Sequence, residues 1–487
     1  MSKIVVLGID ALDPVLLERW KDDLPNFRKI MDEGYSAPLE STMPPDSIPA
    51  WVTIYTGMQP WQHGVVDSMD YLDIRGGTRA LDTGILIGKT FWDVASAAGK
   101  RVCVINPLLA YPVWPVNGIM VNGPVFITGE AQSHPSEIMD KFDIPELGGM
   151  ADFPGKKDLA GFLERTEQVT RDQARFGLEL MAIEEWDVFF LCFLTLDRVM
   201  HFLWRYTDPD DPTYPGRNPL ETSIKDFFRM FDSVVGDFID RLSPEQALLI
   251  VSDHGHGRRP VKALYVNEIL RKEGLLKTRS GGVPGINPVA LVEKTKNAFL
   301  RIMQRLDLED QVYRIASLIP KDKRKQLKSS SYAVDRHAST AWVSEVGGGT
   351  SFGGIDINRA LLSTDPKAYE TLRDRLIGLV RSVVDESGST VAAWVKRREE
   401  VFTGRNIEKY PDVIFDLREE YGVDRTVFCG TFGISATHKK VSGGHSKYGT
   451  LMLYRAASAP ADTRPHISSV FDIIRQNLGI VNSPGLK

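Results

Sequence analysis

The chain has 487 residues, of which 43% are hydrophobic and 25% charged, and its formal net charge is -5. This composition is typical of a soluble globular protein, and without an excess of Lys and Arg it argues against binding to nucleic acid or an anionic membrane. Three cysteines cannot form a disulfide framework, the first apolar run is too short for a signal peptide, and no stretch approaches the roughly 18 apolar residues of a membrane helix. We therefore expect a cytoplasmic protein; its oligomeric state cannot be read from the sequence.

The predicted elements alternate between apolar strands and amphipathic helices. The chain opens with a strand over residues 3–9, and a helical pattern follows over 15–33, which Pro25 should split in two. Further strands are predicted at 102–108, 188–196, 247–251 and 413–417, and helices at 159–186, 222–242 and 368–384. This alternation predicts an α/β fold, with a mostly parallel central sheet, helices on both faces and a functional site at the carboxyl ends of the strands.

Two stretches interrupt this pattern. Residues 73–154 are rich in Gly and Pro, which suggests long loops over the sheet. Residues 274–349 combine a Ser/Gly loop, helical segments and a charged run, and we interpret them as an inserted cap or lid subdomain. The catalytic core would then comprise residues 1–273 and 350–487.

Three acidic residues follow predicted strands, and two of them have a histidine nearby. Asp10 ends the first strand, Asp197 lies four residues before His201, and Asp253 precedes His254. On a helix, residues four apart share one face, so Asp197 and His201 could reach the same metal ion. Taken singly, these patterns also fit an ordinary surface pair and a capping Asp with a packed His.

A serine and a further histidine complete the set. Pro49 suits the first turn of a helix, which places Ser47 at or next to the helix N-terminus, where an anion is favoured. His445 follows Gly443 and Gly444 on a predicted Gly-rich loop, and glycines allow a close approach of backbone to a site. A capping serine and a surface loop explain the same residues separately.

Together, three Asp, three His and one Ser can hold two divalent ions. A pair of ions roughly 3.5–4 Å apart can clamp an in-line displacement at phosphorus. Three clustered carboxylates would repel one another without a cation, whereas two divalent ions would reverse the local field and attract a phosphate.

The order of these residues resembles the alkaline phosphatase superfamily, in its type I phosphodiesterase/nucleotide pyrophosphatase branch. Residues 47–65 are similar to the nucleophile helix, T-G turn and H-G signature of that branch, and the resemblance covers residues 3–73, 185–260 and 430–455. It implies one metal bound by Asp10, Ser47, Asp253 and His254, and another bound by Asp197, His201 and His445. It favours zinc, with manganese or iron as alternatives that suit the same ligands.

The resemblance also implies a mechanism in which Ser47 attacks phosphorus and water hydrolyses the resulting phosphoenzyme. We expect a small-molecule phosphate ester as substrate, with a phosphodiesterase or nucleotide pyrophosphatase activity. A phosphomonoesterase or a cofactor-independent phosphomutase is the alternative, although the interval between Ser47 and Asp197 looks too short for the large domain of such mutases. A sulfatase is excluded, because no Cys or Ser is followed by the x-P-x-R sequence that formylglycine formation needs.

Substrate contacts are harder to predict. The branch usually has Thr as nucleophile and an Asn about twenty residues later that holds a phosphate oxygen, and here these positions are Ser47 and Ser68. Arg198, Arg258 and Lys447 lie next to predicted ligands and could pair with phosphate oxygens. His256 lies two residues after His254 and could reach the site, but we do not predict that it binds substrate, and we expect His63 and Trp51 to have packing roles.

Overall fold

The computed structural model divides the chain into two compact units. Unit 1 comprises Met1–Gly257 and Gly443–Lys487, and unit 2 comprises Arg258–Ser442. The structure describes residues 3–67, 83–125, 129–148, 154–279, 288–305, 308, 333–347, 350–362, 366–435 and 437–480. None of the helices in these ranges is long and apolar enough to span a membrane.

Unit 1 is built on an eight-stranded sheet with the order β2-β17-β7-β1-β6-β3-β4-β5. The five strands from β7 to β4 are parallel, and β2, β17 and β5 add antiparallel edges. The strands are β1 (Lys3–Ile9), β2 (Tyr35–Glu40), β3 (Val102–Ile105), β4 (Gly118–Asn122), β5 (Gln132–His134), β6 (Val188–Phe193), β7 (Gln246–Val251) and β17 (Tyr448–Tyr454). Every residue of β6 and β7 is buried, as expected for parallel strands covered on both faces.

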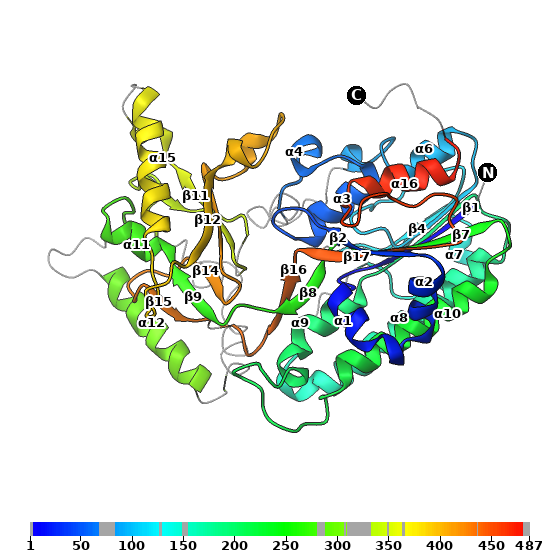
Figure 1. Cartoon of the computed structure of the whole chain (residues 1–487), viewed down its shortest axis with the longest axis horizontal. Coiled ribbons are helices and arrows are strands. Elements are labelled where there is room, and N and C mark those ends of the chain that lie inside the picture. Colours follow the sequence, from blue (N-terminus) through cyan, green and yellow to red (C-terminus); the bar gives the residue numbers. More distant parts are fainter. Residues whose placement is uncertain are drawn as a thin grey trace. The chain divides into compact units, whose positions relative to one another are not determined.

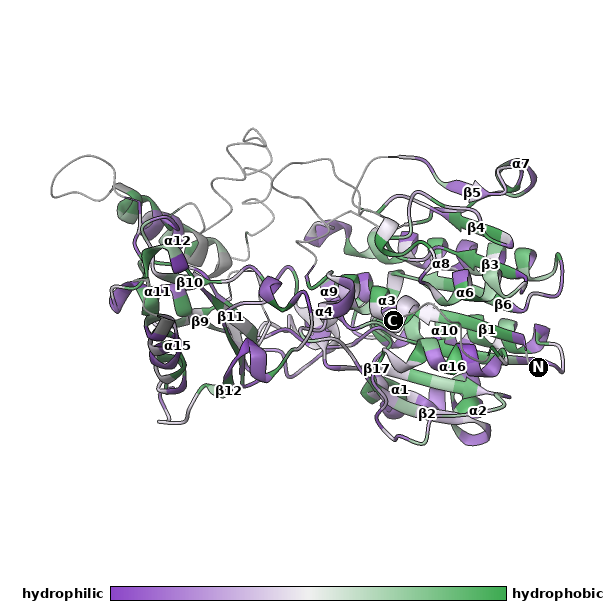
Figure 2. Cartoon of the chain, turned by 90° about the horizontal axis from the view of Figure 1, so that it is seen from above, coloured by the Kyte–Doolittle hydropathy of each residue, from purple (hydrophilic) through white to green (hydrophobic). Residues whose placement is uncertain are grey.

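Helices cover both faces of this sheet (Figure 1). On one face, α8 packs with α9 and α10, and α10 also packs with α2; on the other, α3 packs with α6 and α16. The helices are α1 (Pro14–Trp20), α2 (Pro25–Glu33), α3 (Ser47–Thr56), α4 (Pro60–His63), α6 (Phe91–Ala97), α7 (Ile138–Lys141), α8 (Leu159–Met181), α9 (Thr195–Thr207), α10 (Ser223–Arg241) and α16 (Ser469–Asn477). Figure 2 shows the strands between these layers mostly in the green of apolar residues. The predicted α/β fold is therefore confirmed.

The predictions for the N-terminal half hold in part. The helical pattern over 15–33 does break at Pro25, where the short 3-10 turn Lys21–Asp23 precedes α2. The strand predicted at 102–108 is present as β3, but the rest of the stretch 73–154 was wrongly predicted as long loops, since its described residues also contain α6, β4 and β5. β4 has only five residues and begins at Gly118 with a φ of 151°, so its periodicity is too short to stand out among the glycines and prolines.

Unit 2 contains two further sheets, with the orders β10-β11-β13-β12 and β14-β9-β15. The first is antiparallel throughout. The helices and strands of unit 2 are β9 (Lys262–Tyr265), α11 (Val266–Lys272), α12 (Pro288–Arg305), β10 (Ala341–Val343), β11 (Phe352–Ile357), α15 (Pro366–Arg381), β12 (Ala392–Arg397), β13 (Val413–Leu417), β14 (Tyr421–Asp424) and β15 (Phe432–Ile434). The strand predicted at 413–417 is thus real, but it belongs to this antiparallel sheet and not to the parallel one.

The predicted insertion, 274–349, lies inside unit 2, whose bounds are wider. Residues 280–287, 306–307, 309–332 and 348–349 fall outside the described ranges. A buried apolar cluster joins β9, β10, β11, β13 and α15 in this unit, so residues on both sides of the predicted insertion share one core. The role of the insertion as a cap stays a prediction.

Candidate metal centre

The sheet of unit 1 brings the three predicted acidic residues to one edge. β1 lies between β6 and β7 and pairs with both in parallel, so that Ile9 is opposite Phe193 and Gly8 is opposite Val251. Asp10 follows β1 directly, Asp253 follows β7 by two residues, and Asp197 lies in the first turn of α9, which begins after β6. Adjacent parallel strands end at the same edge, and this places the three carboxylates together.

The first cluster consists of Asp10, Asp253 and His254. Their ligand atoms all lie within 4.8 Å of one another, and all three side chains are buried. His254 Nε2 is 3.2 Å from Asp253 Oδ2 and 3.7 Å from Asp10 Oδ1. His254 Nδ1 lies 2.9 Å from the carbonyl of Gly255, and because a carbonyl only accepts, Nδ1 carries the proton and Nε2 turns its lone pair to the carboxylates.

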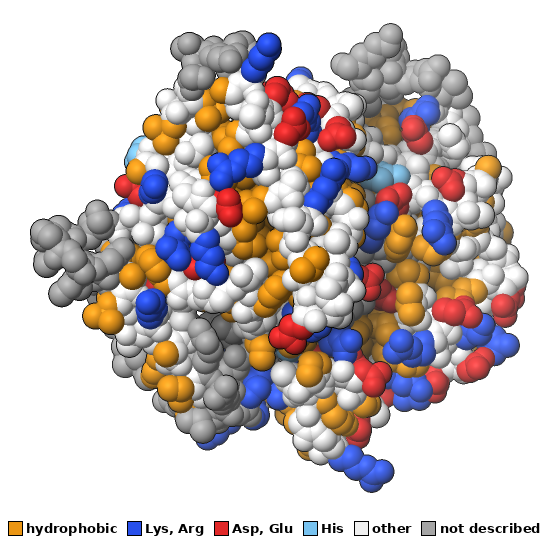
Figure 3. All heavy atoms as spheres, turned by 60° about the vertical axis from the view of Figure 1, so that its left-hand side comes forward, with side chains coloured by type: hydrophobic (Ala, Val, Ile, Leu, Met, Phe, Trp, Pro, Cys, Tyr) orange, Lys and Arg blue, Asp and Glu red, His pale blue; other side chains and the backbone are white. Residues whose placement is uncertain are grey.

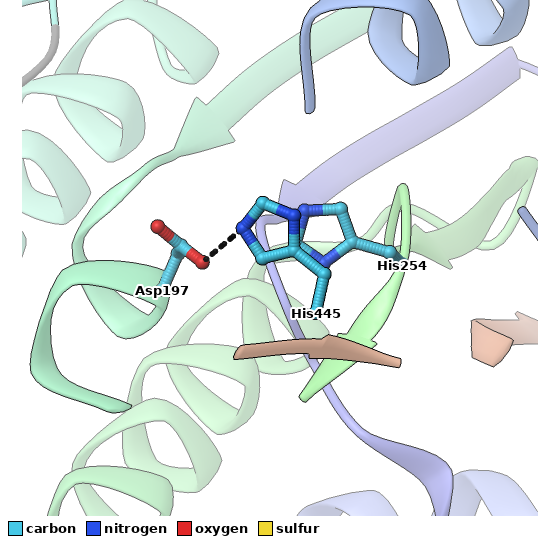
Figure 4. A group of neighbouring side chains, drawn as sticks. All are labelled: Asp197, His254 and His445. Atoms are coloured by element: carbon cyan, nitrogen blue, oxygen red, sulfur yellow. Dashed lines mark ion pairs between the residues drawn. The ribbon is translucent and has the colours of Figure 1, made fainter. Parts of the chain in front are cut away.

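The second cluster consists of Asp197, His201 and His445. Asp197 Oδ1 is 3.3 Å from His201 Nε2 and 3.5 Å from His445 Nε2, and the two Nε2 atoms are 3.1 Å apart. Asp197 and His445 also share a group of candidate ligands with His254, whose ring stacks on that of His445 at 3.9 Å (Figure 4). The clusters are therefore neighbours.

The outer nitrogens of the second cluster have backbone partners. His201 Nδ1 is 2.9 Å from the carbonyl of Gly443, and His445 Nδ1 is 3.0 Å from the carbonyl of Pro45. Both rings therefore donate outwards from Nδ1, and two Nε2 lone pairs face each other at 3.1 Å. That contact is repulsive unless a proton or a cation lies between the nitrogens, and a carbonyl behind each ligating histidine is the usual outer partner at metal sites.

The pKa values of the cluster show the effects of burial and of crowded carboxylates. Burial, together with the charges of Asp253 and Asp197, raises the pKa of Asp10 well above its usual range, and burial raises the pKa of Asp253 to about 7. Burial lowers the pKa of His201 to about 3 and that of His254 well below its usual range. Burial also opposes a charge on His445, but the hydrogen bond and charge of Asp197 outweigh it and raise this pKa to about 9.

Several buried atoms of the site have no hydrogen-bond partner among the described residues. They include Asp10 Oδ1, Asp197 Oδ1 and Asp253 Oδ2. Buried polar atoms are normally satisfied, and a buried carboxylate without a partner is costly. Carboxylate oxygens and imidazole nitrogens are also a donor set that suits Zn, Mn or Fe, so these residues fit the predicted divalent ions.

Ser47 lies beside the first cluster. It is the first residue of α3, whose remaining residues are all buried, and Asp46 caps the helix by accepting a hydrogen bond from the Ile48 N–H. Ser47 Oγ is partly exposed and 3.0 Å from His254 Nε2. The predicted N-terminal position is thus correct within one residue, and the helix N-terminus favours negative charge next to the hydroxyl.

Three residues that support the site were not among the predicted site residues. Trp51 was expected only to pack, yet its indole N–H also donates to Asp10 Oδ2 at 3.0 Å. Asp13 Oδ2 accepts hydrogen bonds from the His256 N–H and the Ser446 hydroxyl, and so joins α1 to two segments that carry ligands. His256 is the third, because its Nδ1 lies 3.4 Å from Asp197 Oδ1. The spacing of two residues between His254 and His256 could have indicated it, since alternate residues of an extended segment share a face.

His445 lies on a strand and not on the predicted loop. Gly443–Ser446 form β16, which pairs with β8 (Gly255–Arg258). A Cβ at Gly443 would lie 2.3 Å from the carbonyl of Met200 and 2.6 Å from His256 Nε2. Glycine is therefore required here because β16 runs directly against α9.

The predicted substrate-binding residues have different surroundings. Arg198 follows Asp197 on α9, with its guanidinium 4.9 Å from the centre of the Phe202 ring. Lys447 pairs with Glu40 at 2.8 Å, and Arg258 is exposed at the end of β8. Ser68 lies outside the described residues. His63 is buried and bonded to Thr53 and the Val65 N–H, as expected of a packing residue.

Solved structures share this fold. Phosphonoacetate hydrolase from Sinorhizobium meliloti 1021 matches with a TM-score of 0.57 and 14% identity in complex with phosphonoformate, over 98% of this chain and 96% of that chain. Its complex with phosphonoacetate gives 0.59 and 13% over the same shares. An inactive variant of murine ectonucleotide pyrophosphatase/phosphodiesterase 5 in complex with AMP gives 0.51 and 11%, over 99% of this chain and 96% of that chain.

One of two sequence comparisons bears out the predicted resemblance. A comparison with curated proteins finds no match. The sequence pattern described as type I phosphodiesterase / nucleotide pyrophosphatase matches residues 4–342, well over half of the chain. The chain belongs to this family, and it is a phosphoester hydrolase with an alkaline phosphatase-like fold.

Proposed function

We propose that this protein is a two-metal-dependent phosphodiesterase that acts through a covalent intermediate on Ser47. The observation that carries the proposal is the convergence of imidazole lone pairs and unpartnered carboxylate oxygens beside the Ser47 hydroxyl. Such an arrangement is costly unless cations bind to it.

The residues divide into two ligand sets. Asp10, Asp253 and His254, with Ser47 Oγ, would hold one divalent ion, and Asp197, His201 and His445 would hold the other. Bound divalent ions supply Lewis acidity, which stabilises charge on the phosphoryl oxygens and on the attacking hydroxyl. Zinc, manganese and iron all suit these donors, and family membership favours zinc.

Ser47 is held where a nucleophile is needed. The buried body of α3 fixes its position, while its hydroxyl stays partly exposed to an incoming ester. In the proposed reaction the Ser47 oxygen forms a bond to phosphorus as the bond to one alcohol breaks, and the Ser47 proton leaves with that alcohol. Water then cleaves the resulting serine phosphodiester, which releases the phosphomonoester and restores the Ser47 hydroxyl. The helix N-terminus favours the negative charge that builds up on the phosphoryl group.

The proposed substrate rests on family membership. We propose a small phosphodiester, with Ser68, Arg198, Arg258 and Lys447 as candidate contacts to its phosphate. A phosphomonoester substrate, or transfer of phosphate within one molecule, is the alternative. The three cysteines are free, in keeping with the proposed cytoplasmic location.

The test compares nitrophenol release from bis-(p-nitrophenyl) phosphate and from p-nitrophenyl phosphate by zinc- or manganese-loaded protein. We expect the diester to be preferred, and Ser47→Ala to lower the rate by more than about 10³-fold, since it removes the covalent route. Ser36→Ala, on the exposed side of β2, is the matched control and should leave the rate unchanged.

Other outcomes would redirect the assignment. Full activity of Ser47→Ala would refute the covalent mechanism, and preference for the monoester would replace the diesterase by a phosphomonoesterase. Release of phosphate from phosphonoacetate, the molecule bound in one of the similar structures, would move the substrate from esters to phosphonates.

A further inference from the structure

His256 is a buried histidine beside the second cluster. It lies on β8, and neither ring nitrogen has a hydrogen-bond partner among the described residues. Its Nδ1 is 3.4 Å from Asp197 Oδ1, and Asp197, His201 and His256 form a group whose ligand atoms lie within 4.8 Å of one another. A buried imidazole without partners is costly, so its position requires an explanation.

The position of His256 is set by its neighbours. Asp13 Oδ2 accepts a hydrogen bond from the His256 N–H at 3.1 Å. The His201 ring meets the His256 ring edge-on at 4.7 Å. On the far side, Nε2 has room only because residue 443 is glycine, since a Cβ there would lie 2.6 Å away. The ring is therefore held with Nδ1 towards Asp197.

The separations around Asp197 match those within one coordination sphere. Asp197 Oδ1 lies 3.3 Å from His201 Nε2, 3.4 Å from His256 Nδ1 and 3.5 Å from His445 Nε2. Ligand atoms at about 2.0–2.1 Å from a tetrahedral zinc are about 3.3 Å from one another. His256 Nδ1 is thus as close to Asp197 as the two histidines already assigned to this ion.

We propose that His256 is a fourth protein ligand of the ion held by Asp197, His201 and His445, and that it binds through Nδ1. The inference rests on the proposed two-metal function. It makes the two ligand sets chemically different, with three histidines in one and a single histidine in the other. It also distinguishes His256 from its three neighbours, whose Nδ1 atoms donate to backbone carbonyls and whose Nε2 atoms face inwards.

The alternative is a positioning role, in which His256 donates an N–H to Asp197 and never contacts the metal. The two roles predict different effects of zinc on the ¹⁵N resonance of His256 Nδ1. This resonance should shift if His256 binds the metal through Nδ1, and should remain that of a protonated nitrogen if His256 only positions Asp197. Histidine-selective ¹⁵N labelling and long-range ¹H–¹⁵N spectra separate them, because a metal-bound imidazole nitrogen differs from a protonated one. The experiment uses the full chain, without metal and with two equivalents of zinc.

We expect zinc to shift four histidines, three at Nε2 and one at Nδ1, and the Nδ1 signal to be missing in His256→Ala. This variant should bind one of its two zinc ions about 10–100-fold more weakly in chelator competition. His63→Ala is the matched control, since His63 is buried in unit 1 but bonded to Thr53. The spectrum of this variant should lack only the His63 resonances, which zinc does not shift in the wild type.

The wild-type spectrum alone decides the question if His256→Ala fails to fold. Zinc shifts at three histidines, all at Nε2, would overturn the inference and leave the two-metal function intact. Binding of fewer than two zinc ions would overturn the proposed function, and this inference with it.

Discussion

Asp412 of unit 2 and the pair Asp10 and Asp253 of unit 1 are buried acidic residues with opposite electrostatic surroundings. In unit 2, Asp412 has a side chain only 9% exposed, and it lies 3.2 Å from Arg359 and 3.4 Å from Arg398. The Tyr369 hydroxyl and the Ile357 N–H donate to it as well. Its charge is compensated within the chain.

In unit 1, no Lys or Arg of the described residues forms an ion pair with Asp10, Asp197 or Asp253; their only positively chargeable partners are histidines. Surface charges do not show this contrast, because Figure 3 has Lys and Arg interspersed with Asp and Glu over the face that carries unit 2. The candidate metal centre is therefore distinguished by buried carboxylates that have histidines, and neither Lys nor Arg, as partners among the described residues, and not by acidity itself.

Asp253→Asn should show the largest effect. With metal present, we expect a fall in hydrolysis of about 10³-fold, because one ligand of the proposed ions loses its charge. Without metal, the variant should be more stable than the wild type above pH 7, where the Asp253 carboxylate, whose pKa is raised to about 7, is charged at a cost. Rates and thermal unfolding with and without chelator check both effects.

Asp232→Asn is the control for Asp253→Asn. Asp232 is also a buried acid of unit 1, but its carboxylate accepts from the N–H groups of Asn26 and Phe27, away from the site. It should leave hydrolysis unchanged. If metal-free Asp253→Asn were less stable than the metal-free wild type, the idea of uncompensated charge would be wrong.

Asp412→Asn should have the next largest effect. It should destabilise the protein, whereas Asp253→Asn should stabilise the metal-free protein. Asp412→Asn leaves Arg398, whose side chain is 4% exposed, with only the more exposed Glu408 and Glu399 as acidic partners, and we expect a loss of about 2 kcal/mol in unfolding free energy. The loss should be the same with and without metal, as measured by denaturant unfolding. A loss that metal ions abolish would show that the two regions are not independent.

The candidate ligands were predictable because their sequence patterns are local. Asp10 and Asp253 follow strands whose apolar runs are plain in the sequence, and Asp197 and His201 are spaced for one helical face. The order of these residues along the chain then indicated the family. The position of Pro49 predicted the start of α3 to within one residue.

What could not be predicted depends on contacts between distant segments. Asp412 meets Arg359 through the pairing of β13 with β11, which no local pattern specifies. His256 approaches Asp197 only because β16 lies against α9 at Gly443, and the glycines there looked equally like a loop. Sequence patterns therefore identified candidate ligands that follow strands, whereas the contacts of Asp412 and His256 depend on the packing of distant segments.

Asp356→Asn should give the smallest effect and sharpen the comparison, because Asp356 is a partly compensated acid of unit 2. Burial raises its pKa to about 6, while hydrogen bonds from Ser344 and Trp342 and the charge of Arg336 oppose the rise. The folded state therefore keeps a proton that the unfolded chain has lost between about pH 4 and 6. Stability due to this group falls as the pH rises through that window and is fully lost above it.

The variant should remove this dependence and gain about 1–2 kcal/mol over the wild type at pH 7, with little difference at pH 4. Unfolding of metal-free protein at both pH values measures the gain, with Glu386→Gln, an exposed acid of the same unit, as control. An equal change at both pH values would mean that Asp356 acts through its hydrogen bonds and not its charge. A gain confined to pH 7 would show that compensation is graded: complete at Asp412, partial at Asp356, and left to bound cations at Asp10 and Asp253.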